Sequence, residues 1–277
     1  MNICCEIPKD LYNVNEELND YDLVLFHLYC EYDWYKEYYL KLRQTNPDRI
    51  MIFDNSAYEF YIKGEKLDLD KYFNAINELN PNYYILPDSL MNRDETLKNA
   101  FDFFNKYNNL ILKSQPIGVI QGRSTSELLN CYNKFIFKGI SNIAIPFHLD
   151  LFKNSIPLAD TYQRFLNKFG KLNEDHYYAM GRIDWIRQYI HLFKNCQYIH
   201  LLGSHNPYEV DFYHNFNISS IDTGYPVKCA MEGYELFSEP NKPNIIIDEF
   251  LTDPLKDEQK SLIVSNINSF KKLCLKH

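Results

Sequence analysis

The chain has 277 residues, of which 45% are hydrophobic and 24% are charged. This apolar fraction excludes a disordered chain, and the length suits one large domain or two small ones. The 29 Lys and Arg residues against 37 Asp and Glu residues give a net charge of −8, which argues against a general nucleic-acid coat protein but leaves room for a local basic face.

Signals for membranes and for export are missing from the sequence. No apolar run reaches the roughly 18 residues that a membrane span needs, and the first residues lack a basic leader before a long apolar run. The seven cysteines are odd in number and include no Cys-x-x-Cys spacing, which predicts free thiols in a reducing compartment. We therefore expect a cytoplasmic protein with no membrane contact.

Short apolar runs rich in β-branched or aromatic residues recur along the chain. Most are continuous rather than alternating, which is typical of strands buried on both faces of a parallel sheet. In chain order they cover residues 3–7, 23–28, 50–53, 83–86, 117–120, 143–145, 198–202 and 220–222. Helical spacing follows most of them, over residues 69–79, 93–107, 126–137, 158–169, 184–193 and 207–214.

Eight strands that alternate with helices predict an α/β fold, a single-domain (β/α)8 TIM-like barrel. Ser124 stands three residues before Glu127, and Asn206 precedes a proline, both of which indicate helix starts. An open doubly wound sheet is the alternative, although no Gly-rich phosphate loop supports it. We expect the barrel to cover residues 1–237 and a C-terminal extension to cover 238–277, with the boundary in 238–243 and a terminal helix over 258–275.

Polar residues follow the predicted strands where each strand ends. Asp54, Asp88, Gln121 and Asp222 occupy four such positions, and Gly203-Ser204-His205 occupies a fifth. In a barrel the carboxyl ends of the strands surround one pocket, so these groups are candidates for one active site. For any one Asp, capping of the next helix is the alternative interpretation.

Carboxylates beside an amide suggest chemistry on a glycosidic bond or a nucleobase. One carboxylate attacks an anomeric carbon while another transfers a proton. A further carboxylate with a glutamine complements guanine, which offers N1–H and its 2-amino group as donors and O6 as an acceptor. We expect the crowding of Asp54, Asp88 and Asp222 to raise the pKa of at least one of them.

Four blocks of this sequence resemble, in order, blocks of the tRNA-guanine transglycosylase superfamily. Residues 52–59 (IFDNSAYE) resemble the Asp-Ser-Gly-Gly-Tyr/Phe-Gln block, and residues 117–122 (IGVIQG) match the Gly-(Ile/Val)-Val-Gln-Gly block. Residues 200–207 (HLLGSHNP) are similar to His-Tyr-Leu-Met-Gly-x-Gly-x-Pro, and residues 221–228 (IDTGYPVK) to Phe-Asp-Cys-Val-x-Pro-Thr-Arg. The blocks span most of the chain, and Asp88 falls between the first and the second.

The resemblance implies a role for each residue at a matching position. Asp222 stands at the position of the nucleophile that attacks C1′ and expels guanine, and Asp54 at that of a general acid/base. Asp88 would read N1–H and the 2-amino group of the base, and Gln121 would read O6. Tyr58 stands at the position of the ring that stacks on the base. Leu202 stands at an apolar wall position of the site, with Gly203 beside it.

Three departures from the family pattern bear on these roles. Ser56-Ala57 replaces a Gly-Gly pair, and Pro146-Phe147 stands where the family has Gly-Gly. Pro146 removes one N–H donor, and Phe147 either stacks on the base or closes the site. The tRNA branch binds zinc with a Cys-x-Cys-x-x-Cys cluster and a His after the nucleophile. Here only Cys229, Cys274 and His277 follow, without ligand spacing, so we expect no zinc and no other cofactor.

A relative without zinc is most similar to the phage and bacterial DNA-modifying branch, which inserts 7-deazaguanine bases such as 7-cyano-7-deazaguanine into DNA. We therefore expect an enzyme whose partners are DNA and the free base, in the cytoplasm of a bacterial host if the gene comes from a phage. A helper protein that opens the duplex is also expected. The alternatives are a tRNA substrate, a nucleoside or glycoside hydrolase that uses Asp54 and Asp222, and an inactive binding subunit.

A DNA substrate requires cations near the barrel mouth despite the net negative charge. The candidates follow predicted strands or lie in nearby loops, and for each of them an ordinary solvated surface charge is the alternative. They are Arg93, Arg123, Arg182, Arg187 and Lys228.

Overall fold

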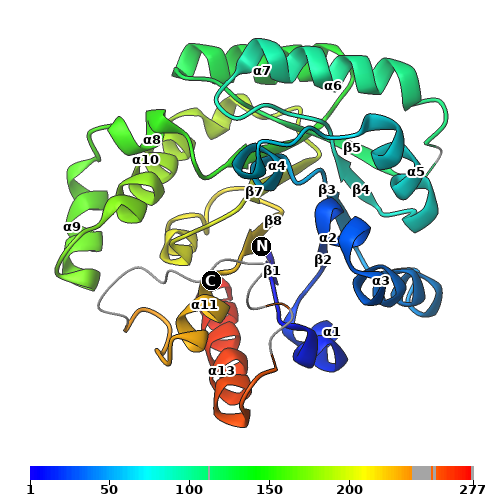
Figure 1. Cartoon of the computed structure of the whole chain (residues 1–277). Coiled ribbons are helices and arrows are strands. Elements are labelled where there is room, and N and C mark those ends of the chain that lie inside the picture. The colour runs from blue at the N-terminus through cyan, green and yellow to red at the C-terminus, as the bar shows by residue number, and fades with distance from the viewer. Residues whose placement is uncertain (112, 239–250, 252–253, 276–277) are drawn as a thin grey trace. The chain divides into compact units, whose positions relative to one another are not determined.

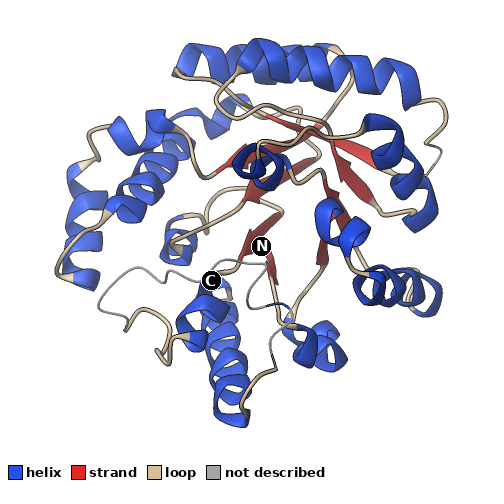
Figure 2. Cartoon of the chain, in the orientation of Figure 1, coloured by secondary structure: helices blue, strands red, loops and turns tan. Residues whose placement is uncertain are grey.

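The computed structural model describes residues 1–111, 113–238, 251 and 254–275. Eight strands form one parallel sheet in the order β1-β8-β7-β6-β5-β4-β3-β2, and helices alternate with them (Figures 1 and 2). The predicted (β/α)8 TIM-like barrel fold is thereby confirmed. The strands are β1 (Asn2–Cys5), β2 (Asp22–Leu25), β3 (Met51–Asp54), β4 (Tyr83–Ile85), β5 (Gln115–Val119), β6 (Asn142–Pro146), β7 (Tyr198–Leu202) and β8 (Ser220–Thr223).

The predicted helical segments are found in the structure. One helix begins earlier than predicted, and further helices that were not predicted lie between them. Helices α5 (Leu69–Leu79) and α6 (Arg93–Tyr107) have the predicted bounds, whereas α10 (Glu174–Tyr189) begins ten residues before the predicted start at residue 184. The remaining elements are η1 (Lys9–Val14), α1 (Asn15–Leu18), α2 (Phe26–Glu31), α3 (Asp33–Thr45), α4 (Ala57–Lys63), α7 (Thr125–Phe137), α8 (Asp150–Asn154), α9 (Ala159–Phe169), η2 (Ile190–Leu192), η3 (Pro207–Phe212), α11 (Tyr225–Met231) and α13 (Asp257–Cys274).

Helix starts follow the capping chemistry in the sequence. The Ser124 hydroxyl accepts from the Glu127 amide at 3.3 Å, as the spacing predicts. The Glu127 carboxylate turns instead to the Arg123 amide, at 2.6 Å. Helix α10 begins with a complete capping box, in which His176 accepts from the Asn173 amide at 2.8 Å and donates its own amide to the Asn173 side chain at 3.1 Å.

The chain divides into two compact units, which we describe separately. Unit 1 comprises Met1–Asp20, Asp150–Lys194 and His200–His277, and unit 2 comprises Tyr21–Leu149 and Asn195–Ile199. Unit 1 therefore holds β1, β8 and the carboxyl end of β7, and unit 2 holds β2 to β6. The predicted boundary segment 238–243 lies outside the described residues except for Ser238, and the division at residue 237 stays a prediction.

In unit 2 the strands are buried, as their continuous apolar sequences predict. Met51, Ile52 and Phe53 of β3 are fully buried. Tyr72 of α5 lies over the ends of two strands, and its hydroxyl contacts the carbonyl oxygens of Phe53 and Ile85 at 3.0 and 2.8 Å. Helices α6 and α7 run side by side in this unit (Figure 1).

In unit 1 the terminal helix α13 confirms the helix predicted over residues 258–275. It packs along α11, the short helix that follows β8 (Figure 1). Asn266 of α13 is buried, and its amide group donates to the carbonyls of Pro226 and Tyr234 at 3.1 and 3.0 Å. These bonds fix the segment that leaves β8, because a buried amide is costly unless it is paired.

Across the described part of the chain, no helix combines the length and the apolar character needed to cross a bilayer.

Candidate functional site

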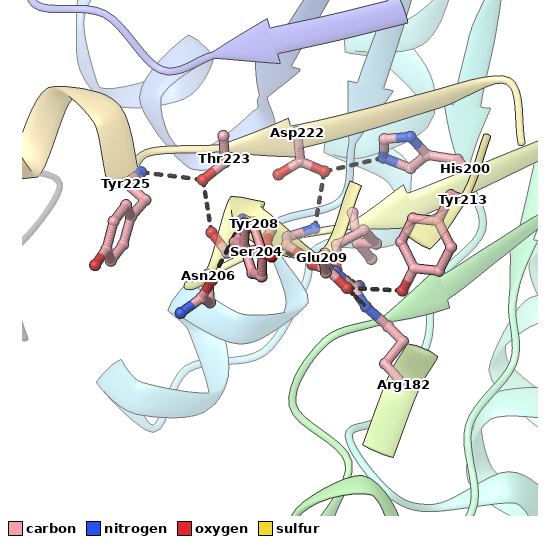
Figure 3. A network of polar contacts seen from close by, with 12 residues as sticks. Arg182, His200, Ser204, Asn206, Tyr208, Glu209, Tyr213, Asp222, Thr223 and Tyr225 are labelled. Carbon is pink, nitrogen blue, oxygen red and sulfur yellow. Dashed lines mark hydrogen bonds and ion pairs between the residues drawn. The ribbon is translucent and has the colours of Figure 1, made fainter. Parts of the chain in front are cut away.

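Asp222 lies near the carboxyl end of β8 in unit 1 and is 4% exposed. Its Oδ1 accepts a hydrogen bond from the Gly203 amide at 2.8 Å and lies 3.0 Å from Nε2 of His200. The second carboxylate oxygen points away from both partners (Figure 3). One oxygen is thus fixed by the Gly203 amide, with the His200 ring beside it, while the other oxygen is turned away from both.

Gly203 connects this carboxylate to a buried ion pair. Its φ of +66° is in the left-handed region that favours glycine, so its amide and carbonyl turn to different partners. The amide donates to Asp222, and the carbonyl accepts from Nη2 of Arg182 at 2.9 Å. Arg182 Nη1 also contacts the Leu202 carbonyl at 3.3 Å. The end of β7 is therefore held on one side by Arg182 and is bonded to Asp222 on the other.

Arg182 and Glu209 form an ion pair whose side chains are both 0% exposed. Arg182 Nε donates to Glu209 Oε2 at 2.9 Å, and Nη2 donates to Oε1. Ser204 and Tyr213 donate their hydroxyls to the same carboxylate, at 2.5 and 2.9 Å (Figure 3). Burial acts to lower the pKa of Arg182, but the charge and hydrogen bonds of Glu209 outweigh it and raise that pKa. Arg182 therefore remains protonated in this buried position.

This burial corrects one expectation. Arg182 was expected to contact nucleic-acid phosphates, but its guanidinium has no exposed surface and is occupied by Glu209 and two carbonyls. Its position on α10 turns it inward, which a charge count along the sequence does not reveal. The remaining candidates for phosphate contact are treated below.

A small cavity of about 70 Å³ lies beside Asp222 in unit 1. The end of β8 forms one wall of this cavity. There the Thr223 hydroxyl donates to the Ser204 carbonyl at 2.6 Å and accepts from the Tyr225 amide at 3.0 Å. Its lining is mostly polar or charged and includes Glu6, Asp175, His205, Asp222, Thr223 and Lys228. His205 Nδ1 and Asp175 Oδ2 are 3.9 Å apart. A carboxylate thus faces a recess that also contains a cation, Lys228.

In unit 2, Asp54 ends β3 and is 7% exposed. Its Oδ2 accepts from the Ser56 amide at 2.8 Å, a turn that an aspartate makes with its own backbone. Ser56 has a φ of +56°, in the left-handed region. Its hydroxyl contacts both the backbone amide and Nδ1 of His27, at 3.2 and 2.9 Å, which helps to hold this unfavourable conformation.

Asp88 and Gln121 come together in unit 2, as their places after neighbouring strands predict. Gln121 Nε2 donates to Asp88 Oδ2 at 2.8 Å, and Asn55 Nδ2 donates to Oδ1 at 2.9 Å. The carbonyl oxygen of Gln121 accepts from the Met91 amide at 2.9 Å. Each carboxylate oxygen of Asp88 therefore has an amide donor of its own.

The pKa of Asp88 is raised above its ordinary value, and the cause differs from the expected one. Burial raises it, while the hydrogen bonds from Asn55 and Gln121 act to lower it. We expected crowding by other carboxylates to raise a pKa at the site, but desolvation is the cause here. The raised pKa of Asp88 therefore follows from its own burial and not from the charge of another carboxylate.

The aromatic and apolar candidates differ in exposure. Tyr58 on α4 is 43% exposed, and its ring stacks on His148 with 5.7 Å between centroids and 13° between planes. Phe147 is 1% exposed and contacts the His148 ring edge-on at 5.1 Å. This burial leaves no exposed ring face for stacking on a base, and the alternative that Phe147 closes the site stays a prediction. Leu202 ends β7 and is half-buried.

The other four candidates for phosphate contact are at or near the surface, and two of them form ion pairs. Arg93 pairs with Asp94 at 2.7 Å, and Arg187 pairs with Asp160 at 2.8 Å. Arg123 is exposed, and Lys228 is half-buried in the wall of the cavity beside Asp222. Pairs of this kind at the surface are weak, so phosphate contacts by these four residues stay predictions.

The cysteines after Asp222 do not resemble metal ligands. Cys229 is fully buried and Cys274 is half-buried, and burial raises the pKa of each thiol to about 12. A zinc site needs thiolates, which are favoured by a lowered pKa. His277 lies outside the described residues. The expectation that the chain binds no zinc stays a prediction.

Sequence reasoning missed the residues that hold the carboxylate. His200 was included only as the first residue of the block over residues 200–207, and Glu209 was not noted as part of the site. A signal existed for His200, since it is the one polar residue in the strand sequence Tyr-Ile-His-Leu-Leu. Glu209 gave no such signal, because it lies in the first turn of a helix, where acidic residues are common since they interact favourably with the helix dipole.

The sequence matches no protein-family model and no curated protein.

Proposed function

We propose that the chain is a guanine-exchanging transglycosylase that acts on DNA and inserts a 7-deazaguanine base. A (β/α)8 fold is common among enzymes, with active sites formed at the carboxyl ends of the strands. In the proposed reaction an Asp222 oxygen attacks C1′ and the C1′–N9 bond breaks, and the leaving guanine takes a proton from Asp54. N9 of the incoming base then loses its proton to Asp54 and attacks C1′, which releases the Asp222 carboxylate.

The oriented carboxylate of Asp222 is the observation that carries this proposal. A nucleophilic carboxylate must present one oxygen to the reacting carbon while the rest of the group is held still. The Gly203 amide donates to Oδ1, and Nε2 of His200 lies 3.0 Å from the same oxygen. The other oxygen points away from both partners, and Asp222 also lines a polar cavity. A carboxylate that only caps a helix would accept from the amides of that helix instead.

Base recognition is supported by the cluster around Asp88. A carboxylate with a neighbouring glutamine complements the guanine edge, and Asn55 and Gln121 leave each Asp88 oxygen a further lone pair for N1–H and the 2-amino group. Tyr58 has an exposed ring on the helix that follows Asp54, which suits stacking.

The resemblance gains support at Ser56, which stands where the family has glycine. Its φ of +56° is the conformation that glycine adopts without strain. The loop thus keeps a glycine-like shape although its residue has changed. DNA is favoured over tRNA because the residues after Asp222 carry no Cys-x-Cys-x-x-Cys motif.

The test is incorporation of labelled 7-cyano-7-deazaguanine into duplex DNA, single-stranded DNA and tRNA by the purified chain. We expect incorporation into DNA, with guanine released in equal amount. Asp222→Asn should abolish it, whereas Asp102→Asn, an exposed aspartate of α6, should keep it. Incorporation only into tRNA would contradict the choice of polymer. Release of guanine without incorporation would indicate a hydrolase, and inactivity towards all three polymers would overturn the proposal.

A further inference from the structure

His200 lies between Ser220 and Asp222 in the interior of unit 1. Its side chain is 0% exposed. Ring atom Nδ1 is 2.9 Å from the Ser220 hydroxyl, and Nε2 is 3.0 Å from Oδ1 of Asp222. The two partners are two residues apart on β8 and therefore face the same side of the strand. Strand pairing sets His200 of β7 directly against Ser220.

A neutral imidazole between a carboxylate and a hydroxyl favours one direction of donation. An ionised carboxylate only accepts, so the contact with Asp222 is favourable when Nε2 carries the hydrogen. In a neutral imidazole Nδ1 is then the acceptor, and the Ser220 hydroxyl must donate to it. The Ser220 hydroxyl therefore supports the tautomer of His200 that carries its hydrogen on Nε2, since it can donate to Nδ1. Figure 3 shows His200 and the Gly203 side of the network reaching the same oxygen of Asp222.

We propose that His200 is a positioning residue for Asp222 and favours its release from the covalent intermediate. The inference rests on the proposed function. When the incoming base attacks C1′, the bond from C1′ to the Asp222 oxygen breaks and its electron pair returns to the carboxylate. The N–H groups of His200 and Gly203 stabilise that charge as it forms. They make the carboxylate a weaker nucleophile but a better leaving group.

This role predicts an uneven effect on the two chemical steps. Loss of the His200 donor should slow the second step by about tenfold, the scale of one hydrogen bond to a charged group. The first step should not slow and should become faster, because the carboxylate without this donor is a stronger nucleophile. A covalent protein–DNA intermediate should then accumulate. A merely structural role would reduce both steps together.

The experiment measures both steps in single-turnover reactions with labelled DNA, with the intermediate trapped by acid. The variants are His200→Phe, which removes both ring nitrogens, His200→Gln, which keeps a donor, and Ser220→Ala, which only frees the tautomer. We expect the trapped intermediate to increase in His200→Phe, to increase less in Ser220→Ala, and to return towards wild type in His200→Gln. Circular dichroism confirms which variants are folded.

The outcomes separate this inference from the proposed function. If the wild-type chain exchanges bases and the intermediate does not increase in folded His200→Phe, the inference is wrong. If that variant does not fold, Ser220→Ala decides, since it removes one hydroxyl and leaves the ring in place. An unchanged ratio of the two rates in Ser220→Ala would then overturn the inference. A wild-type chain that forms no intermediate on any polymer contradicts the proposed function itself.

Discussion

Two carboxylates after strands, one in each unit, are held in different ways. In unit 1, Asp222 accepts from Gly203 and approaches His200 through a single oxygen. In unit 2, Asp88 accepts from Asn55 on one oxygen and from Gln121 on the other. The first arrangement leaves one oxygen turned away from its donors, and the second uses both oxygens symmetrically.

Under the proposed function, this difference suits Asp222 to a reacting group and Asp88 to a recognising group. A nucleophile needs one oxygen with an open approach, and donors on the other oxygen set its orientation. A carboxylate that reads two adjacent N–H groups needs both oxygens in fixed places, which two amides provide. The strand pattern alone makes Asp88 and Asp222 equivalent, because each is a polar residue at the end of an apolar run, and only the family resemblance suggests different roles. Their hydrogen-bond partners distinguish them.

The largest expected effect compares Asp222→Asn with Asp88→Asn. The first should reduce kcat for exchange by at least about a thousandfold and abolish the covalent intermediate, since an amide is a poor nucleophile. The second should raise KM for the incoming base by about tenfold to a hundredfold and leave the intermediate detectable. Steady-state kinetics and acid trapping measure both. Equal losses of kcat in the two variants would break the distinction.

A second prediction concerns the support that only the unit 1 carboxylate has. Arg182→Met leaves Glu209 buried without its partner and should lower the free energy of unfolding by roughly 3–5 kcal/mol. Arg164→Met is the control, because Arg164 forms its ion pair at the surface, where such pairs contribute at most about 1 kcal/mol. Urea denaturation of both variants measures the difference. A similar cost for the two would show that the buried pair is not needed to hold β7.

A third prediction is that the stability of the folded chain falls in acid because of His176 in unit 1. Burial lowers the pKa of His176 from 6.5 to about 4. The unfolded chain then binds a proton before the folded chain does, so stability is complete above pH 6.5 and decreases as the pH falls towards 4. The loss in the free energy of unfolding reaches about 3 kcal/mol, because each pKa unit corresponds to about 1.4 kcal/mol.

Denaturation of His176→Gln at several pH values tests that dependence. Glutamine keeps the capping-box chemistry at this helix position without titrating. The variant should show a smaller loss of stability between pH 6.5 and 4. His191→Gln, at an exposed position in the same unit, should behave like wild type. An unchanged acid dependence in His176→Gln would show that other groups cause it.

The smallest expected effect concerns the raised pKa of Asp88 in unit 2. Because the folded state holds this proton more tightly than the unfolded chain does, Asp88 adds stability at low pH and loses that contribution as the pH rises through its folded pKa. This sign is opposite to that of His176. Recognition of the base needs the ionised form, so KM for the base should rise as the pH falls through the same range. Asp88→Asn should lack this change in KM, and a retained change would assign the titration elsewhere.

The sequence allowed the fold and part of the site to be predicted. Continuous apolar strands and helical spacing gave the eight strands and helices such as α5, because these patterns are local. Asp88 and Gln121 were placed together because they follow neighbouring strands of a parallel sheet. The helix α3 was missed, since its tyrosine-rich sequence (DWYKEYYLKLRQT) conceals a simple apolar stripe.

Contacts that depend on register could not be predicted. The approach of His200 to Asp222 requires β7 and β8 to pair with His200 opposite Ser220, and a shift by one residue would turn it away. Arg182 and Glu209 are 27 residues apart, and neither position carries a sign of burial in the sequence. The wrong expectation for Arg182 arose in this way, because a charged residue near a predicted strand end is ordinarily solvated.

The ion pair of Arg182 and Glu209 limits how this sequence can change over evolutionary time. Loss of either residue alone leaves a buried charge, whereas replacement of both by apolar residues of similar volume costs little. Divergence at these positions should therefore be correlated, so that descendants of this chain keep both residues or have lost both. The pair thus provides a marker in sequence alone, by which relatives that hold Gly203 in the same way are recognised.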